Sequence, residues 1–233
     1  MAQFLVTGGS GFIGSHLCRK LLGEGHGVRV LDNLSSGKRE NLSDIADDID
    51  FLEADLLDED ALQRAVKGVE YVLHHAAVAS VQTSVEQPLM EQQINSVGTL
   101  RLLEAARQAG VRRVVFAASA AAYGNDPRVP KREDMRPTPE SPYAISKLVG
   151  EYYCGAYSRL YGLETVCLRY FNVYGPCQDP ASPYSGVISI FAKRMLNGQV
   201  PLVHGDGLQT RDFVSVHDVV AANVLAYQVE CAQ

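Results

Sequence analysis

A glycine-rich turn between an apolar run and a helical pattern constrains this chain more than any other feature. Residues 4–7 are apolar or β-branched, as a buried strand requires, and glycines follow at positions 8, 11 and 14. Glycines at this spacing let the backbone turn sharply and approach a pyrophosphate, which rests on free N–H groups of the following helix. The spacing also suits an ordinary strand–helix turn, so its context decides between the two interpretations.

Short apolar runs alternate with longer helical patterns through the first two-thirds of the chain. Strands are expected over residues 4–7, 28–31, 50–53, 71–74, 113–117 and 164–169. Helices are expected over residues 11–22, 58–66 and 88–109, and over the segment with Tyr143 and Lys147. Because the strands are apolar on both faces and helices separate them, the sequence predicts an α/β fold with a parallel, doubly wound sheet of Rossmann type.

The pattern changes after Tyr170. A loop rich in proline and glycine spans residues 172–186, and a helix is expected over 187–196. The later elements are a short strand at 201–203, a turn at 205–207, an apolar run at 213–216 and a helix from about 217. We therefore expect two domains: residues 1–170, a dinucleotide-binding Rossmann domain with the catalytic groups, and residues 171–233, the start of a smaller, incomplete substrate lobe.

Composition narrows the possible partners. The 233 residues are 46% hydrophobic and carry a net charge of −6 without a basic run, so no nucleic-acid partner is expected. No apolar stretch approaches the ~20 residues that span a bilayer, and the start of the chain leaves no room for a signal peptide. Five cysteines form no CxxC pair and no ligand set with histidine, which favours a cytoplasmic protein with reduced thiols and no metal.

The acidic residue after the second expected strand supports the dinucleotide interpretation. Asp32 lies 18 residues beyond Gly14, where a carboxylate can bind the adenosine ribose hydroxyls. Its negative charge would repel a 2′-phosphate, so the sequence favours NAD over NADP, although Lys38 and Arg39 lie nearby. The strand, the glycine turn, the helix and this acid together predict NAD binding.

Two further strand ends are expected at the same edge of the sheet. Asp55 and Leu56 follow the third strand, where they contact the adenine or, alternatively, Asp55 is the N-cap of the next helix. Ala76 and Ala77 end the fourth strand and would let a cofactor pass close to the backbone. The paired histidines before them lack partners at metal spacing and are expected to pack at the strand end.

A tyrosine and a lysine four residues apart, with a serine upstream, form the candidate catalytic set. Tyr143 and Lys147 fall on one face of a helix, about one turn apart. A fixed ammonium beside a phenol stabilises the phenolate and lowers its pKa from the ordinary value of ~10. The hydroxyl of Ser119 can hold the oxygen from which such a base takes its proton. The set is suited to oxidising a secondary alcohol beside a hydride acceptor.

These residues are part of a series of motifs that resembles the extended short-chain dehydrogenase/reductase family and, within it, the NAD-dependent nucleotide-sugar epimerases. The resemblance is carried by residues 7–14, 32–34, 55–56, 74–77, 95–99, 119–124, 143–147, 169–176 and 205–213. It extends over essentially the whole chain. It implies NAD as cofactor, a UDP-sugar as substrate, and 4-epimerisation through a transient 4-keto sugar.

The resemblance also implies roles for individual residues. Tyr143 would be the general base and acid, Lys147 would lower its pKa and hold the nicotinamide ribose, and Ser119 would bind the reacting sugar hydroxyl. The other cofactor contacts would be Gly8, Gly11, Phe12, Ile13, Gly14, Asp32, Asn33, Asp55, Leu56, Ala76, Asn95 and Phe171. The other substrate contacts would be Asn172, Val187, Ile188 and Arg211. Alternatively, Asn172 caps a turn and Arg211 forms a surface ion pair with Asp212.

The resemblance also indicates which reaction and which oligomeric state to expect. Relatives that dehydrate the sugar carry an Asp-Glu pair directly after the catalytic hydroxyl residue, whereas Ala120 and Ala121 stand here and cannot move protons. Dehydration is therefore not expected. A reductase or decarboxylase of a nucleotide sugar, or an NAD-binding protein without turnover, stays open as an alternative. The resemblance further implies a homodimer through a four-helix bundle, built from the helix around residues 95–109 and the helix with Tyr143.

Overall fold

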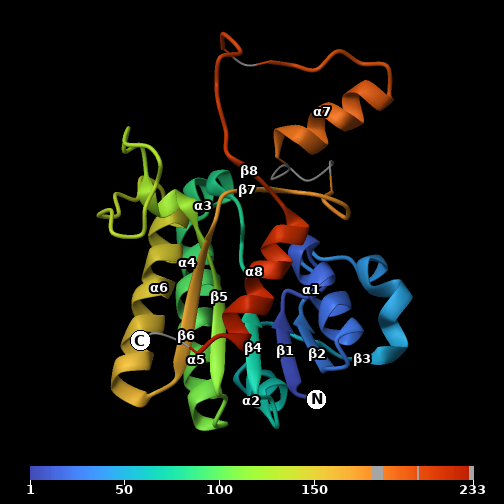
Figure 1. Ribbon diagram of the computed structural model, residues 1–233, viewed down its shortest axis with the longest axis vertical. Coiled ribbons are helices and arrows are strands. Elements are labelled where there is room, and N and C mark those ends of the chain that lie inside the picture. Colours follow the sequence, from blue (N-terminus) through green and yellow to red (C-terminus); the bar gives the residue numbers. More distant parts are fainter. Residues whose placement is uncertain (180–185, 204, 231–233) are drawn as a thin grey trace.

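Six parallel strands form the central sheet, in the spatial order β3-β2-β1-β4-β5-β6 (Figure 1). The structure is a computed structural model and describes residues 1–179, 186–203 and 205–230. The strands are β1 (Gln3–Thr7), β2 (Gly27–Asp32), β3 (Ile49–Glu53), β4 (Tyr71–His74), β5 (Arg113–Ser119) and β6 (Glu164–Tyr170). The order changes direction between β1 and β4, which is the switch point at which open α/β sheets bind ligands.

The central strands are buried on both faces. Leu5 of β1 lies opposite Arg29 of β2 and Val72 of β4, with all three strands parallel. Phe4, Leu5 and Val72 are fully buried. This arrangement explains why the strands read as continuous apolar runs rather than as alternating ones. It confirms the parallel, doubly wound sheet that the sequence predicts.

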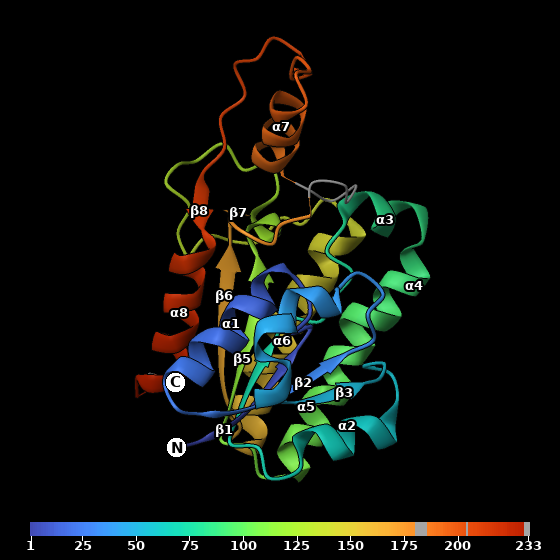
Figure 2. The ribbon, with the colours of Figure 1, turned by 90° about the vertical axis from the view of Figure 1, so that its right-hand side faces the viewer.

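Helices cover the two faces of the sheet (Figure 2). One face carries α1 (Phe12–Gly23), the 3-10 segment η1 (Arg39–Asp48) and α8 (Val216–Gln228). The other face carries α2 (Glu59–Val66), α5 (Gly98–Gln108) and α6 (Pro142–Tyr161). Each face has its own apolar core: Val6 packs with Leu17 of α1, whereas its neighbour Leu5 packs with Leu102 of α5. Successive side chains of a strand point to opposite faces, so one strand serves both cores.

The long helix expected over residues 88–109 is formed by three consecutive segments. They are α4 (Pro88–Gln92), a π-helical turn η2 (Gln93–Val97) and α5. Single π turns inside helices are rare and occur often at functional sites. Three helical segments were not predicted: η1, α3 (Val81–Glu86) and the 3-10 turn η3 (Ala120–Tyr123). The last two are too short to give a periodic pattern.

The residues after β6 begin a small second layer beyond the carboxyl ends of the main strands (Figure 1). There β7 (Asn172–Tyr174) and β8 (Phe213–Ser215) pair in parallel, and the helix α7 (Val187–Leu196) has no buried residue. The strand predicted at residues 201–203 is wrong: these residues have no strand structure. Pro201 lacks a backbone donor, and Leu202 and Val203 are exposed, so neither pairing nor burial favours a strand there.

The last helix of the described chain differs from its expected place. The sequence assigns it to the second lobe, but α8 packs beside α1 on the main sheet. Val220, Val224 and Tyr227 of α8 join the same core as Phe4 of β1. The division at residue 170 stays a prediction, with α8 as an element that returns to the first domain. None of the described helices is long and apolar enough to cross a membrane.

Candidate functional site

A cleft of about 870 Å³ lies at the carboxyl ends of the main strands and under the second layer. It is lined by almost all the predicted contact residues: Gly8, Gly11, Phe12, Ile13, Gly14, Asp32, Asn33, Asp55, Leu56, Ala76, Ser119, Tyr143, Lys147, Phe171, Asn172, Val187, Ile188 and Arg211. Residues predicted from separate motifs along the whole chain therefore meet in one cavity. Asn95 is the exception and does not line it.

The glycine turn leaves no room for side chains at two of its positions. Gly8 has φ +71°, and a Cβ there would lie 2.7 Å from the backbone N of Ala76. A Cβ on Gly14 would lie 2.2 Å from the carbonyl oxygen of Gly8. Gly11 is the N-cap of α1 and supplies no side-chain cap, so the first N–H groups of the helix face the cleft without one. Such a terminus is suited to a phosphate.

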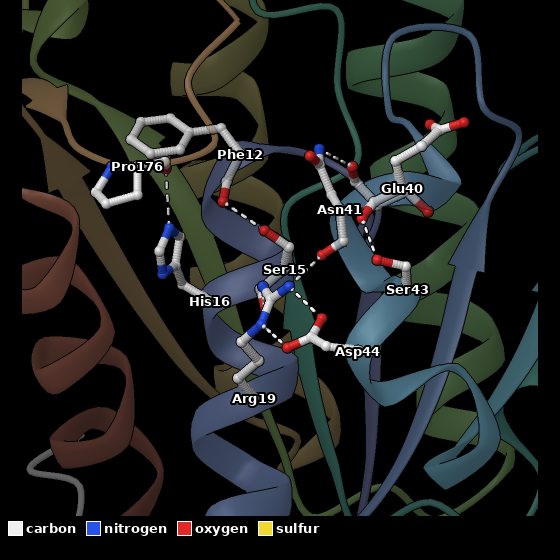
Figure 3. A network of polar contacts seen from close by, with 10 residues as sticks. Phe12, Ser15, His16, Arg19, Glu40, Asn41, Ser43, Asp44 and Pro176 are labelled. Carbon is white, nitrogen blue, oxygen red and sulfur yellow. Dashed lines mark hydrogen bonds and ion pairs between the residues drawn. The ribbon is translucent and has the colours of Figure 1, made fainter.

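A polar network fastens the glycine turn to η1, as Figure 3 shows. The carbonyl of Ser10 accepts hydrogen bonds from Asn41 Nδ2 (2.9 Å) and from the backbone N of Lys38 (3.0 Å). Arg19 of α1 pairs with Asp44 of η1 at 2.6 Å. The segment after β2 is thus held against the start of α1, and it forms one wall of the cleft.

Asp32 lies in this wall, and two backbone N–H groups hold its carboxylate in place. Its Oδ2 accepts from the backbone N of Ser10 (2.9 Å) and its Oδ1 from that of Leu34 (2.8 Å). Because a carboxylate oxygen has two lone pairs, each oxygen keeps acceptor capacity for a ribose hydroxyl. The side chain is nearly buried but lines the cleft.

The two basic residues beside Asp32 have carboxylate partners of their own. Lys38 Nζ lies 2.6 Å from Asp179 Oδ2, and Arg39 Nη2 lies 2.8 Å from Glu53 Oε2. Arg39 also lies over the ring of Phe51. Both cations are therefore engaged elsewhere, which fits a ribose without a 2′-phosphate and supports NAD over NADP.

The structure excludes one of the two interpretations of Asp55, the helix N-cap. The N-cap of α2 is Asp58, whose side chain accepts from the backbone N of Ala61. Asp55 instead accepts from Asn33 Nδ2 at 2.7 Å, so the side chains after β2 and β3 are joined at the cleft. The predicted contact residues Asn33 and Asp55 thus act as a pair.

A buried chain of polar groups holds the end of β4 beside the glycine turn. Thr99 Oγ1 donates to the carbonyl of Asn95 (2.5 Å) and accepts from His74 Nε2 (2.9 Å). His74 Nδ1 then accepts from Thr7 Oγ1 (2.7 Å), which in turn accepts from the backbone N of Ala76 (3.2 Å). Burial lowers the pKa of His74 well below its usual value, so a neutral ring fits this pattern. The paired histidines pack at the strand end as predicted.

Asn95 lies one layer behind the cleft rather than in it. Its Oδ1 accepts from the backbone N of Val78 (2.8 Å), and its Nδ2 donates to the carbonyl of Val78 (3.0 Å). Val78 lines the cleft, whereas Asn95 is only 2% exposed. The expected contact of Asn95 with the cofactor is therefore indirect in this geometry, because the π turn places the amide against the loop backbone.

The three candidate catalytic residues come together at one side of the cleft. Ser119 ends β5, and its hydroxyl accepts from the backbone N of Ala121. Lys147 is 5% exposed, and its Nζ donates to the carbonyl of Ala117 at 2.9 Å. The same Nζ lies 6.0 Å from the centre of the Tyr143 ring. Burial lowers the pKa of Lys147 from 10.5 to about 8.

The pKa of Tyr143 differs from the lowered value that the sequence predicts. Burial raises the pKa of Tyr143 above its usual value, while a hydrogen bond with Ser119 acts in the lowering direction. The predicted lowering by Lys147 is not found in this geometry, in which its Nζ lies 6.0 Å from the centre of the ring. Desolvation of the phenol by burial therefore outweighs the lowering by Ser119.

The substrate end is formed by residues after β6. Phe171 stacks on Tyr123 at a centroid distance of 6.3 Å. Asn172 Nδ2 donates to the carbonyl of Asp212 (2.9 Å), so it joins β7 to the residue before β8 rather than capping a turn. Arg211 Nη1 donates to the carbonyl of Thr210, and no ion pair with Asp212 is present among the described residues. Val187 and Ile188 at the start of α7 are 40% and 37% exposed and line the cleft.

Two long-range contacts, one of them at the cleft, were missed from the sequence. His75 Nε2 lies 3.1 Å from the hydroxyl of Tyr170, which accepts from Asn223 Nδ2 of α8 at 2.6 Å. His16 Nε2 donates to the carbonyl of Pro176 at 2.9 Å, as Figure 3 shows. Both join residues more than 50 positions apart, and neither follows a local spacing that sequence reasoning could use. Across the described residues, no group of three or more His, Cys, Asp or Glu is placed to hold a metal.

Comparisons with known proteins identify the family. The sequence model of the "NAD dependent epimerase/dehydratase family" matches residues 4–231. The UDP-glucose 4-epimerase of Mycolicibacterium smegmatis is 46% identical over 226 residues, which are 95% of this chain and 72% of that protein.

Solved structures agree in fold and in sequence. A UDP-N-acetylglucosamine 4-epimerase of Methanobrevibacter ruminantium, solved with UDP-N-acetylmuramic acid, superposes with a TM-score of 0.95 at 42% identity; 99% of this chain and 74% of that one are covered. The UDP-glucose 4-epimerase of Thermus thermophilus, solved with NAD, gives a TM-score of 0.90 at 45% identity, with 98% and 75% covered. The chain belongs to the NAD-dependent epimerase/dehydratase family.

Proposed function

We propose that this protein is an NAD-dependent 4-epimerase of a UDP-sugar. The observation that carries the proposal is that Ser119, Tyr143 and Lys147 line the same cleft as the glycine turn and Asp32. A proton-accepting phenol and a dinucleotide site in one cavity are what a reversible oxidation of a sugar hydroxyl requires. The relatives named above are epimerases of UDP-glucose and of UDP-N-acetylglucosamine, which supports the substrate class.

The cofactor end of the cleft fits NAD. The free N–H groups at the start of α1 would bind the diphosphate, and Asp32 would bind the adenosine ribose. The Asn33–Asp55 pair and Leu56 would border the adenine, and Ala76 would leave room for the backbone approach. When bound, NAD supplies the acceptor and later the donor of the hydride at C4.

The protein's own residues move the proton and orient the sugar. Ser119 holds the C4 hydroxyl, and Tyr143 as phenolate takes the proton from its oxygen as the hydride leaves C4. The 4-keto sugar then turns over in the cleft. Tyr143 returns the proton to the same oxygen when the hydride comes back to the other face of C4. Lys147, as a buried ammonium, would stabilise the phenolate and bind the nicotinamide ribose.

The residues after 170 would hold the nucleotide part of the substrate. Asn172 and Arg211 border the cleft as donors suited to a diphosphate, and Phe171 lies at its nicotinamide end. Val187 and Ile188 offer exposed apolar surface that is suited to the flat face of a uracil. Ala120 and Ala121 lack the acidic groups that dehydration needs. We propose residues 1–170 as the cofactor domain and the segment from 171 as the beginning of the substrate lobe.

A product assay tests this function. Purified protein is incubated with UDP-glucose, and separately with UDP-N-acetylglucosamine, without added NAD, and the galacto products are measured. Formation of one of them is expected. Absence of both products even with added NAD would refute epimerisation by this chain, and bound NAD without turnover would instead support a non-catalytic NAD-binding protein.

The role of Tyr143 has its own test. Tyr143→Phe removes the proton acceptor and keeps the ring, so kcat should fall by about 10³-fold. The amount of NAD bound per chain should stay at the wild-type level. Val129→Glu, in an exposed loop outside the cleft, is the control and should keep full activity. A wild-type kcat in Tyr143→Phe would show that the phenol is not the proton acceptor.

A homodimer in the cytoplasm is the last part of the proposal. Ile145, Tyr152 and Leu160 form an exposed apolar stripe along α6 with exposures of 46%, 62% and 72%, which supports pairing through a four-helix bundle with α5. Four cysteines of the described chain are free, as expected of a reducing compartment. Sedimentation should show a dimer for the wild type and a monomer for Tyr152→Glu. A monomeric wild type would refute the dimer.

A further inference from the structure

Glu91 is a fully buried carboxylate that the proposed mechanism does not use. It lies in α4, is 0% exposed and does not line the cleft. Among the described residues it forms no ion pair with Lys, Arg or His. Burying a carboxylate without a hydrogen-bonded environment is costly, so its surroundings indicate what it holds in place.

Three donors converge on this carboxylate. Ser146 Oγ donates to Oε1 at 2.5 Å, Asn95 Nδ2 contacts the same oxygen, and Gln92 Nε2 donates to Oε2 at 3.1 Å. Asn95 is the residue that holds the cleft loop at Val78. One carboxylate thus joins that loop to the helix that carries the candidate catalytic pair.

The contact with Ser146 reaches the turn of α6 between Tyr143 and Lys147. Ser146 directly precedes Lys147, and its Oγ also lies 3.0 Å from the carbonyl oxygen of Tyr143. A shift of Ser146 would therefore move both the phenol and the amine. Glu91 fixes this turn from the side that faces away from the cleft.

The charge of Glu91 is as relevant as its contacts. Lys147 faces His74 at the end of β4 and His75 directly after it. It also faces Phe116 and the carbonyl of Ala117 of β5, and Tyr143 of its own helix. Burial lowers the pKa of both histidines, that of His75 to about 3, so they carry no charge near neutral pH. Glu91 is the acidic side chain that acts on Lys147, in the direction that favours the ammonium.

We propose that Glu91 is a positioning residue for the Tyr143–Lys147 pair, whose carboxylate fixes the intervening turn of α6 and is the counter-charge of the buried Lys147 ammonium. The inference rests on the proposed function, which gives this pair its chemistry. Glu91 acts through other residues and touches neither substrate nor cofactor.

The charge gives the proposal a specific signature in the pH dependence. Glu91 raises the pKa of Lys147 and also that of Tyr143. Removing one negative charge should therefore lower the pKa of both groups. If the two limbs of a bell-shaped kcat profile report these groups, both limbs move toward lower pH together. A merely structural residue would lower the plateau without moving the limbs.

The test compares Glu91→Gln with Glu91→Asp. Glutamine keeps an oxygen that can accept from Ser146 and Asn95 but removes the charge. Both limbs of its profile should move by about one pH unit to lower pH, with unchanged KM for the UDP-sugar. Aspartate keeps the charge, so its limbs should stay at the wild-type pH even with a lower plateau. Glu86→Gln, an exposed acid of α3, is the matched control and should keep the wild-type profile.

Several outcomes would overturn the proposal. If both limbs of the Glu91→Gln profile stay at the wild-type pH, Glu91 is not the counter-charge of Lys147. The same conclusion follows if the Glu91→Asp profile is displaced as far as that of Glu91→Gln. If Glu91→Gln fails to fold, Ser146→Ala decides: it removes the contact and keeps the charge, so the plateau should fall while the limbs stay. Displaced limbs in Ser146→Ala would contradict the proposal.

A readout without turnover separates this inference from the proposed function. The ¹⁵Nζ signal of Lys147, assigned by its loss in Lys147→Met, is titrated in the wild type and in Glu91→Gln. It should titrate at lower pH in the variant. If the wild type converts neither UDP-sugar, the proposed function fails, while this titration still supports or refutes the counter-charge.

Discussion

Burial of the Lys147 amine makes the unfolding free energy of the protein depend on pH. Lys147 is 5% exposed, and burial lowers its pKa from 10.5 to about 8. Between these two values the unfolded chain binds more protons than the folded one, so the folded state gains stability as the pH rises. Below pH 8 both states are protonated, and the cost of burying the charge is present in full.

Replacing this amine should change the pH dependence of stability. Lys147→Met has no titrating group at this position, so burial of a charge costs it nothing at any pH. The stability that it gains over the wild type should therefore be larger at pH 7 than at pH 10. The difference in unfolding free energy between the two proteins should shrink by roughly 3 kcal/mol over that range. Urea denaturation at several pH values measures it. A pH-independent difference would show that Lys147 is not desolvated.

Single residues were predictable where their chemistry is local. Tyr143 and Lys147 are recognised by their spacing on one helix, and Asp32 by its distance from the glycine turn. The sequence could not predict Glu91, because its role comes from residues 55 positions away along the chain. Nor could it predict the raised pKa of Tyr143, which depends on how deeply the phenol is buried.

The start of α1 shows how one element depends on the absence of side chains. A Cβ on Gly14 would meet the backbone of Gly8 and Gly9, which cannot move aside as a flexible side chain could. Gly23, at the other end of the same helix, has nothing within 4 Å of such a Cβ. The two glycines therefore form a matched pair within α1.

Alanine at these two positions should have opposite effects. Gly14→Ala should cost about 1–3 kcal/mol of unfolding free energy and lower the NAD content, because the turn must open. Gly23→Ala should gain roughly 0.5–1 kcal/mol, because alanine restricts the unfolded chain at an unhindered helical site. Urea unfolding and the absorbance of released NAD measure both. A Gly14→Ala protein that keeps wild-type stability and NAD would show that the turn is looser than described.

Long elements were predicted well and short ones were not. The six main strands and α1, α2 and α7 were expected within one or two residues at most ends, since their apolar periodicity extends over several turns or strand positions. The helix α6 was expected without stated ends. The three-residue strand β7 and the six-residue helix α3 have too few residues for a pattern. Their place is set by partners elsewhere, such as β8 for β7.

At the scale of the whole molecule, Arg113 joins the last helix to the central sheet. This side chain is 1% exposed, and its Nη1 donates to the carbonyls of Ala226 and Val229 at 2.7 Å each. Its Nη2 lies 2.6 Å from Glu164 of β6. The end of α8 is thereby fixed to β5 and β6, where the sequence predicted a separate lobe.

Removing this guanidinium should weaken the entire fold. Arg113→Met leaves two helix-end carbonyls and Glu164 without their donor, so the unfolding free energy should fall by about 3 kcal/mol. The neighbouring Arg112→Met is the control: Arg112 is 59% exposed and 3.9 Å from Glu164, so its loss should cost less than about 1 kcal/mol. Chemical denaturation measures both. Equal losses would show that the burial of Arg113 adds nothing.

The return of α8 has a consequence for how the protein is made. Tyr227 of α8 packs on Phe4 of β1 at a centroid distance of 4.8 Å and bonds to Glu24 just after α1. Phe4 therefore gains this neighbour only after residue 227 has been synthesised, late in the described chain. The apolar core on this face of the main sheet is therefore complete only when nearly all of the described chain has been made.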